Sequence, residues 1–368
     1  MRTMLAATSA IEQVKHLINV VCQPHWFLIL SVVALSVFLL GYRTFTKPAV
    51  AAVIGALAVL FFLASCLDSN FVKIVTKADN VPIVMMMFLV GFFLWLAFRR
   101  AAINDERMER GEPLVEAGAD DKVLVWPDLV YIELIAIVLC TALLIVWAVV
   151  LPAPLEQPAN PNLAPNPAKA PWYFLGLQEM LVYFDPWLAG VVFPGLIVVG
   201  LIAIPYIDKN PRGNGYYTFA QRPFAITTFL FGFVILWVVL IIFGTFLRGP
   251  NWNFFGPYEY WDHHRPAALL NTEFHDLIWI GLLGRALPEN FLVRELPGIL
   301  LLGAYFVAGP LVLRALFFRK MYVQLGLIRF NVVAFLLLMM LLMPIKMVLR
   351  WTLNLHYIIG ITEWFFNV

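Results

Sequence analysis

The sequence predicts an all-α, polytopic membrane protein with about eight transmembrane helices. Hydrophobic residues make up 62% of the 368-residue chain, and charged residues only 13%. The apolar residues gather in runs of about 17–24, which are long enough to cross a hydrocarbon core of roughly 30 Å as helices. The runs lack the alternation of apolar and polar residues that is typical of a membrane β-barrel. Helices also satisfy their own backbone hydrogen bonds in lipid.

The eight expected spans follow from these runs. They are Trp26–Tyr42, Ala49–Cys66, Val81–Phe98, Leu129–Leu151, Trp187–Ile207, Phe224–Leu247, Gly298–Leu313 and Phe330–Val348. The eighth is the least regular, because it contains Pro344 and Lys346. Lys346 lies near the end of that span and Glu133 near the start of the fourth, so we expect both side chains to reach an interface.

Lysine and arginine residues indicate which loops face the cytoplasm. Of the 25 in the chain, fourteen fall in one alternating set of loops, and ten fall in the other set, which includes both termini. We therefore expect the first set in the cytoplasm and both termini outside. The first set comprises Arg43, Lys47, Arg99, Arg100, Arg107, Arg110, Lys122, Lys209, Arg212, Arg222, Arg314, Arg319, Lys320 and Arg329.

Four parts are expected along the chain. Residues 1–98 form a three-helix membrane part, which we expect to be a separate bundle, and residues 99–122 form a polar cytoplasmic connector. Residues 123–313 form a four-helix part, and residues 314–368 an extra helix and tail. The net charge is only +2, and no basic run indicates a nucleic-acid partner.

Residues that ligate metals are scarce. The three cysteines, Cys22, Cys66 and Cys140, form no CxxC pair and no heme-attachment or iron–sulfur pattern. Cys22 and Cys66 both fall near the expected outer surface, so a disulfide between them is one alternative, but separate thiols are favoured. None of the six histidines lies deep in a firm span. We therefore expect no metal site and no heme ligated by this chain.

The connecting segment Asn166–Pro186, "NPAKAPWYFLGLQEMLVYFDP", combines many aromatic side chains with several polar ones. It continues the proline-rich stretch Leu151–Pro171, which favours extended chain over the outer surface. Its second half, Leu175–Tyr183, is expected to form a short helix. A further aromatic outer loop, residues 244–265, is typical of an interfacial belt, with partner contact as the alternative.

Three motifs in this order resemble a known family. They are "WPDLVYIEL" (Trp126–Leu134), "APWYFL" (Ala170–Leu175) and "IPYID" (Ile204–Asp208). The pattern resembles the C-terminal half of cytochrome b in bc-type quinol:cytochrome c oxidoreductases, the half that is a separate chain, subunit IV, in the photosynthetic relatives. The resemblance covers about Val123–Leu313, so the fourth to seventh spans would be helices E to H.

The resemblance implies a membrane subunit of a quinol oxidoreductase in a respiratory chain of the bacterial cytoplasmic membrane. Its loop would form part of the quinol-oxidation site on the outer face, with quinol or quinone as the ligand. The hemes would sit on a diheme cytochrome b-like partner, alongside a Rieske or other Fe–S subunit, a cytochrome c, or both, and lipids. The expected quinol-binding residues are Pro171, Trp172, Tyr173, Phe174, Leu175 and Gln178.

The sequence departs from the family within one motif. The family motif is Pro-Glu-Trp-Tyr, whereas this chain has Ala170, Pro171, Trp172 and Tyr173. The glutamate commonly assigned to accept a proton from quinol is thus replaced by Pro171, which cannot accept one. We expect Glu179, the first acid after the motif, to take this role, because burial among aromatic residues would disfavour its charged form.

Alternatives to this role stay open. Glu179 could face water or cap a short helix, and Asp185 would then be the next candidate acceptor. The missing glutamate also favours a second function, a structural membrane scaffold of a respiratory complex with an inactive quinol site. A transporter or channel is the least favoured hypothesis, because charged residues within the spans are scarce.

Overall fold

The computed structural model describes residues 2–118, 123–151, 158, 160–162, 164–171, 174–210, 217–266, 270–361 and 367–368, the side chains of residues 2–9 excepted. Over these residues the chain forms helices and no β-strand, which confirms the all-α class. Seven helices are long and apolar enough to cross a membrane, or eight if one bent pair is a single span. The protein is therefore a multi-pass membrane protein.

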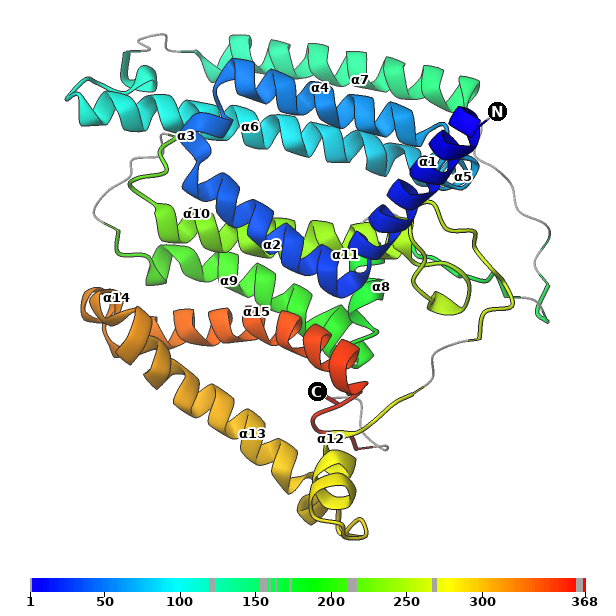
Figure 1. Ribbon diagram of the computed structural model, residues 1–368. Helices are drawn as coiled ribbons and strands as arrows, with labels where there is room; N and C mark the ends of the chain where they lie inside the picture. The colour runs from blue at the N-terminus through cyan, green and yellow to red at the C-terminus, as the bar shows by residue number, and fades with distance from the viewer. Residues whose placement is uncertain are drawn as a thin grey trace.

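The expected spans appear in the expected order (Figure 1). The helices are α4 (Pro48–Ser65), α6 (Val81–Glu109), α7 (Val130–Val150), α9 (Phe193–Ile207), α10 (Pro223–Leu230) with α11 (Val239–Ile242), α13 (Phe291–Val312) and α15 (Leu327–Leu353). Turns of π-helix lengthen several of them, so that the spans run over Val125–Val150, Leu188–Ile207, Pro223–Leu247 and Phe291–Phe317.

The first expected span is α2 (Pro24–Leu40), which meets α1 (Arg2–Val21) at an angle of 81°. Proline lacks a backbone N–H and fits the first turn of a helix, so Pro24 begins a new helix there. The fourth span begins at Val125, four residues before the expected Leu129, with Asp128 in its first turn. An acidic side chain is favoured at that end by the exposed amides.

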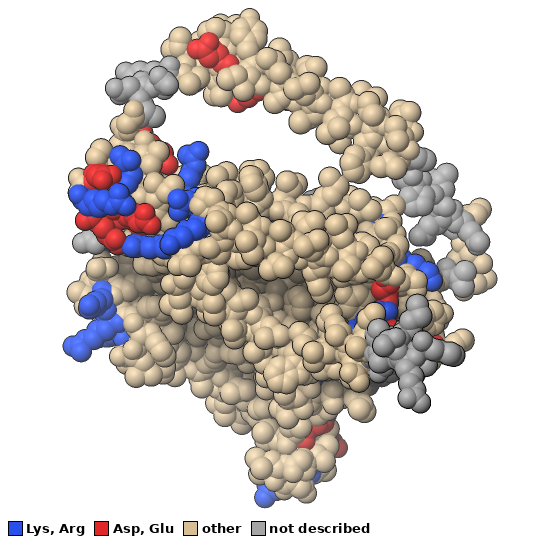
Figure 2. All heavy atoms as spheres, turned by 45° about the horizontal axis from the view of Figure 1, so that its top comes forward, with Lys and Arg blue, Asp and Glu red and all other residues tan. Residues whose placement is uncertain are grey.

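The short helices mark the two ends of the molecule (Figure 1). They are α3 (Tyr42–Phe45), α5 (Ser69–Val75), α8 (Leu175–Met180), α12 (Phe274–Asp276) and α14 (Arg319–Leu325). The end that holds α3, the C-terminus of α6 and α14 also holds the described loops of the basic set. Figure 2 shows mixed basic and acidic side chains gathered at this end. The alternation of loops predicted from the sequence is thus present.

The helix α15 lies in the centre of the protein rather than beside it. Leu342, Met343 and Met347 of this helix share one buried core with Phe184 and Phe193. The segment 314–368, described above as an extra helix and tail, therefore completes the core of the part that precedes it.

The expected separation of the first three spans is incomplete. Leu28 of α2 belongs to the same buried core as Leu240 and Phe243, at the end of the sixth span. The ring of Phe27 also packs on the ring of Phe243, with 5.5 Å between centroids. The helix α2 is thus packed against the expected four-helix part, residues 123–313. Cys22 and Cys66 are free thiols, as favoured above.

The helix α7 stands apart from the other helices. Every residue of α7 after Val130 is exposed, and Figure 2 shows the helix as an arch of apolar atoms separated from the rest by an open gap. An apolar helix in this position contacts either lipid or another protein chain.

The expectation that Lys346 reaches an interface is wrong. Its side chain is fully buried, and its Nζ donates a hydrogen bond to the backbone oxygen of His356 at 2.7 Å. The ammonium also lies 5.6 Å from the ring centroid of Phe184 and 5.8 Å from that of Tyr357. The chain beyond α15 folds back over the end of the helix and supplies these partners, which sequence spacing does not reveal.

A buried aspartate joins the N-terminal helices to the sixth span. Asp105, on the extension of α6 beyond the membrane, accepts hydrogen bonds from Tyr42 Oη at 2.7 Å and from the backbone N–H of Phe219 at 3.1 Å. It also accepts one from the N–H of Ala220 at 3.1 Å. These donors come from two segments, so one carboxylate on α6 fixes the relative positions of three parts of the chain.

We predict that Asp105→Asn lowers the free energy of unfolding by about 1–3 kcal/mol. The amide has only one acceptor oxygen, and its NH2 group would face the N–H and O–H groups that now donate to the carboxylate. Unfolding in detergent micelles measures the loss. The control is Glu106→Gln, which alters a half-exposed i,i+4 pair with Arg110 and is expected to change stability by less than about 0.5 kcal/mol. Equal stability of the two variants would contradict a joining role for Asp105.

Candidate functional site

The aromatic loop is attached to the chain that follows the sixth span. Asn166 Nδ2 donates to Asn251 Oδ1 at 2.8 Å, and the backbone N–H of Asn251 donates to Asn166 Oδ1 at 2.7 Å. The Nζ of Lys169 donates to the backbone oxygen of Thr245 at 2.9 Å. These contacts join segments about eighty residues apart, so the loop is fixed at the C-terminal end of the sixth span.

Gln178 fixes the backbone that precedes the altered motif. Its Oε1 accepts from the N–H of Ala170 at 2.8 Å, and its Nε2 donates to the oxygen of Ala168 at 2.8 Å. Gln178 lies on α8, one turn after the helix begins at Leu175. The side-chain amide thus holds Ala168–Ala170 against α8 and sets the direction in which the chain enters Pro171.

Glu179 forms a buried ion pair with Arg248. Both side chains are almost completely buried, and Arg248 donates to both carboxylate oxygens, from Nη2 to Oε1 at 2.6 Å and from Nε to Oε2 at 2.9 Å. Tyr183 Oη donates to Oε1 at 3.0 Å, and Trp252 Nε1 donates to Oε2 at 3.1 Å. Four donors thus surround the carboxylate, two on each oxygen.

Two of these partners were not anticipated from the sequence. Arg248 was counted only as an outer-loop charge, and Trp252 only as part of an interfacial belt. The available signal is a single arginine placed directly after an apolar span, since a cation at that depth requires a partner. The sequence does not indicate which acid that partner is.

Two glycines allow α8 to approach the sixth span closely. A Cβ on Gly244 would lie 3.0 Å from the backbone oxygen of Leu175, and one on Gly176 would lie 3.3 Å from Ile241 Cγ1. Leu175 itself is buried in this contact. The approach brings α8 within reach of Arg248, so the ion pair depends on small residues at the interface.

The residues expected to bind quinol lie in different surroundings. Pro171 and Phe174 are exposed, Leu175 is buried, and Gln178 is half-buried. Trp172 and Tyr173 lie outside the described residues. The structure thus brings Leu175, Gln178 and Glu179 together on α8. Asp185 is also buried, and its Oδ1 accepts from the backbone N–H of Trp187 at 3.2 Å.

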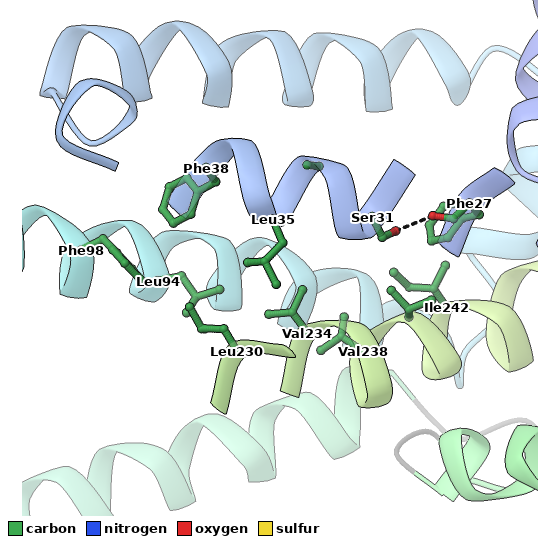
Figure 3. Close-up of a pocket in the computed structure, with 12 residues that line it drawn as sticks. Phe27, Ser31, Leu35, Phe38, Leu94, Phe98, Leu230, Val234, Val238 and Ile242 are labelled. Carbon is green, nitrogen blue, oxygen red and sulfur yellow. Dashed lines mark hydrogen bonds between the residues drawn. The ribbon is translucent and has the colours of Figure 1, made fainter. Parts of the chain in front are cut away.

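An apolar crevice of about 320 Å³ lies between α2, α6 and the sixth span. Figure 3 shows its lining, which runs from Phe27 and Ile242 at one end to Phe98 at the other. The hydroxyl of Ser31 is engaged, because it donates to the backbone oxygen of Phe27 at 2.7 Å. Such a crevice suits a hydrocarbon chain.

The outer end of this crevice lies close to the loop. The ring of Phe27 packs on that of Phe243, and the next residue, Gly244, lies under Leu175 of α8. One layer of packed side chains therefore separates the crevice from α8.

Comparison with known proteins agrees with this arrangement. Residues 158–258 match the family model described as Cytochrome b(C-terminal)/b6/petD, and no solved structure matches the chain. The matched range contains the aromatic loop, α8, the fifth and sixth spans, and the segment that supplies Arg248 and Trp252. It is narrower than the expected Val123–Leu313 but covers the altered motif. Residues 158–258 are therefore a cytochrome b C-terminal-like domain, set within a larger multi-pass membrane protein.

Proposed function

We propose that this chain is a subunit of a quinol oxidoreductase complex, and that the loop Asn166–Pro186 forms one wall of a quinol-oxidation site. One observation carries the proposal. In the segment that matches the cytochrome b family, Gln178 holds the loop against α8, and Glu179 fixes α8 to Arg248 at the end of the sixth span. A wall that orients a flat ring must be held in place, and these contacts hold it.

The proposed reaction divides between this chain and its partners. Quinol oxidation releases two protons and two electrons and leaves quinone. The exposed surfaces of Pro171 and Phe174 suit an aromatic headgroup, and the apolar crevice suits an isoprenoid tail. The electrons would pass to cofactors on partner chains, namely a diheme cytochrome b-like subunit and an Fe–S protein or cytochrome c.

Glu179 stays our candidate for the proton acceptor in place of Pro171. Its four donors would have to rearrange before it could take a proton, because each carboxylate oxygen already accepts two hydrogen bonds. Release of Tyr183 or Trp252 toward a bound headgroup would free one acceptor position. Asp185, which accepts one backbone hydrogen bond, is the second candidate.

The isolated helix α7 supports assembly with another membrane subunit. All of its residues after Val130 are exposed, and it stands clear of the other helices. Within this proposal, a heme-bearing partner would pack against it.

A second function is favoured by the ion pair itself. Glu179 could serve only as the counter-ion of Arg248, with Pro171 leaving the site inactive. The chain would then be a structural subunit of a respiratory complex. Purification with a diheme partner is common to both functions, so quinol turnover distinguishes them.

The proposed site lies on the outer face of the bacterial cytoplasmic membrane, which gives a topology prediction. In a variant without native cysteines, we expect Asp79→Cys to react with an impermeant maleimide in intact cells. Glu112→Cys, at the opposite end of α6, should react only after permeabilisation. Both positions are exposed, so accessibility reports the side of the membrane. The reverse labelling would contradict the proposed orientation.

We predict that Gln178→Leu lowers quinol turnover by about tenfold to hundredfold, because the loop loses both hydrogen bonds that hold Ala168–Ala170. Stability should fall by at most about 1–2 kcal/mol, since both backbone groups can reach water. The matched control is Gln324→Leu on α14, at the other end of the molecule, which should leave turnover unchanged. Normal turnover in Gln178→Leu would argue against this loop as the quinol wall.

We predict that Glu179→Gln lowers the free energy of unfolding by about 3–5 kcal/mol, because Arg248 is left buried without a counter-ion. The double variant Glu179→Met with Arg248→Met should recover most of this loss, since no buried charge remains. Unfolding in mixed micelles measures both effects.

Turnover of the assembled double variant then decides the role of Glu179. Lost turnover supports proton transfer through this carboxylate, and normal turnover leaves it as a counter-ion only. Glu295→Gln is the matched control, because Glu295 is equally buried and hydrogen-bonded to Arg294 and Gly360 on α13 and the C-terminal segment. It should lower stability without lowering the turnover of assembled complex.

A further inference from the structure

A second cavity, of about 350 Å³, lies at the outer end of the molecule. Three segments that are distant in the sequence line it: α5 with the turn after it, the loop at residues 167–169, and residues 259–263. None of the expected quinol-binding residues lines it. The cavity is therefore a different place from the proposed quinol wall, and its argument does not rest on the proposed function.

The lining is rich in positive charge. Lys73, Lys77 and Lys169 all line the cavity. Lys77 pairs with Asp79 at 3.3 Å, whereas in the described part of the chain no carboxylate lies within ion-pair distance of Lys73 or Lys169. Among the described residues, Asp79 is thus the one carboxylate that pairs with any of these three ammonium groups, and it does not line the cavity.

The acid that does line the cavity is already engaged. Glu259 accepts a hydrogen bond from the N–H of Gly256 at 2.9 Å, and its other oxygen lies 3.6 Å from Arg265 Nη1. It is therefore the counter-ion of Arg265 and does not neutralise the lysines. The lining keeps an excess of positive charge.

One lining residue also has a hydrogen-bond donor without a partner. Trp261 lines it, and among the described residues no acceptor lies within reach of its buried Nε1–H. A buried donor without an acceptor costs about 1–3 kcal/mol. The ammonium of Lys169 lies 4.8 Å from the ring centroid of Trp261, so charge and donor are adjacent. An oxyanion in the cavity would satisfy both groups.

We propose that this cavity binds a phosphate-type oxyanion, held by Lys73, Lys77, Lys169 and the indole N–H of Trp261. Two sources share this chemistry, the headgroup of an anionic phospholipid and free inorganic phosphate. The location suits a headgroup, because the cavity lies at the ends of the spans, where tryptophan and tyrosine side chains such as Tyr260 meet the interface.

The protonation of Lys169 makes binding depend on pH. Burial lowers the pKa of Lys169 to about 7, and the positive charges of Lys77 and Arg248 act in the same direction, against the opposing charge of Glu179. The remaining charged or titratable groups of the lining are Lys73, Glu259, Tyr260 and His263. A bound anion favours the ammonium form, so affinity should be highest below pH 7 and fall as the pH rises through this value.

The test titrates the delipidated full-length chain, with any subunits that purify with it, in detergent by calorimetry. The ligands are short-chain phosphatidylglycerol and inorganic phosphate, at about pH 6. We expect saturable binding of at least one, weakened at least about tenfold by Lys169→Gln and by Trp261→Phe. Lys320→Gln, on the exposed surface of α14, is the matched control and should bind like the unaltered protein.

The outcomes separate the sources and can overturn the proposal. Binding of the lipid alone identifies a headgroup site, and competition by phosphate shows that the oxyanion is sufficient. Absence of saturable binding of both ligands would overturn the proposal. Binding that Lys169→Gln and Trp261→Phe both leave unchanged would overturn it as well, because the oxyanion would then lie elsewhere.

A pH series with the lipid gives a readout that a purely structural lysine would not change. The phosphodiester does not titrate in this range, so we expect affinity to fall about tenfold between about pH 6 and about pH 8. Lys169→Arg keeps its charge and should bind at both values, whereas Lys169→Gln should bind weakly at both. An unchanged pH dependence in Lys169→Arg would contradict the role of Lys169.

Discussion

The ion pair between Glu179 and Arg248 links the two segments on which the outer end of the matched domain depends. Glu179 lies on the short helix that follows the altered motif, and Arg248 directly follows the sixth span. Each group is buried, so neither is stable there without the other. The pair therefore fixes the position of α8 relative to the span, and the loop before α8 takes its position from that contact.

The described residues 164–171 of the proline-rich segment are held in place without regular secondary structure. Prolines limit the backbone hydrogen bonds that the loop can form with itself. Side chains supply the missing contacts instead, with Gln178 bonded to Ala168 and Ala170. A buried ion pair often adds little net stability, but it disfavours other arrangements strongly, because each of them leaves a buried charge alone. Its effect here is to select one loop position.

The spans could be predicted from the sequence because a helix that crosses lipid requires only an apolar run of sufficient length. The same requirement explains why the sequence did not reveal which spans are buried in the protein. A helix that faces lipid and one that faces other helices have the same composition, so α7 and α15 looked alike although α7 is exposed and α15 is central. Lys346 was the available sign, since a lysine inside a span indicates a buried partner as well as an interface.

The site was predictable to the extent that its parts are local. The loop and short helix follow from a continuous stretch of sequence, and Glu179 was singled out as the first acid after the motif. Its partner lies 69 residues away, and no spacing rule connects the two. The structure also places Glu179 among four donors, where the sequence had indicated an acid surrounded by apolar rings. Packing between distant segments decided this difference.

The charges at the outer end form one connected arrangement. Lys169 is bonded to the oxygen of Thr245, three residues before Arg248, and it lines the lysine-rich cavity two residues before Pro171. Without an anion, burial and neighbouring positive charges favour the neutral amine of Lys169. The side chain then adds less positive charge next to the loop. With an anion present, Lys169 would hold its proton, and the added negative charge of the ligand would offset it. In the proposed arrangement, the occupant of the cavity therefore sets the protonation of a residue that anchors the loop, while the Glu179–Arg248 pair keeps the loop in place.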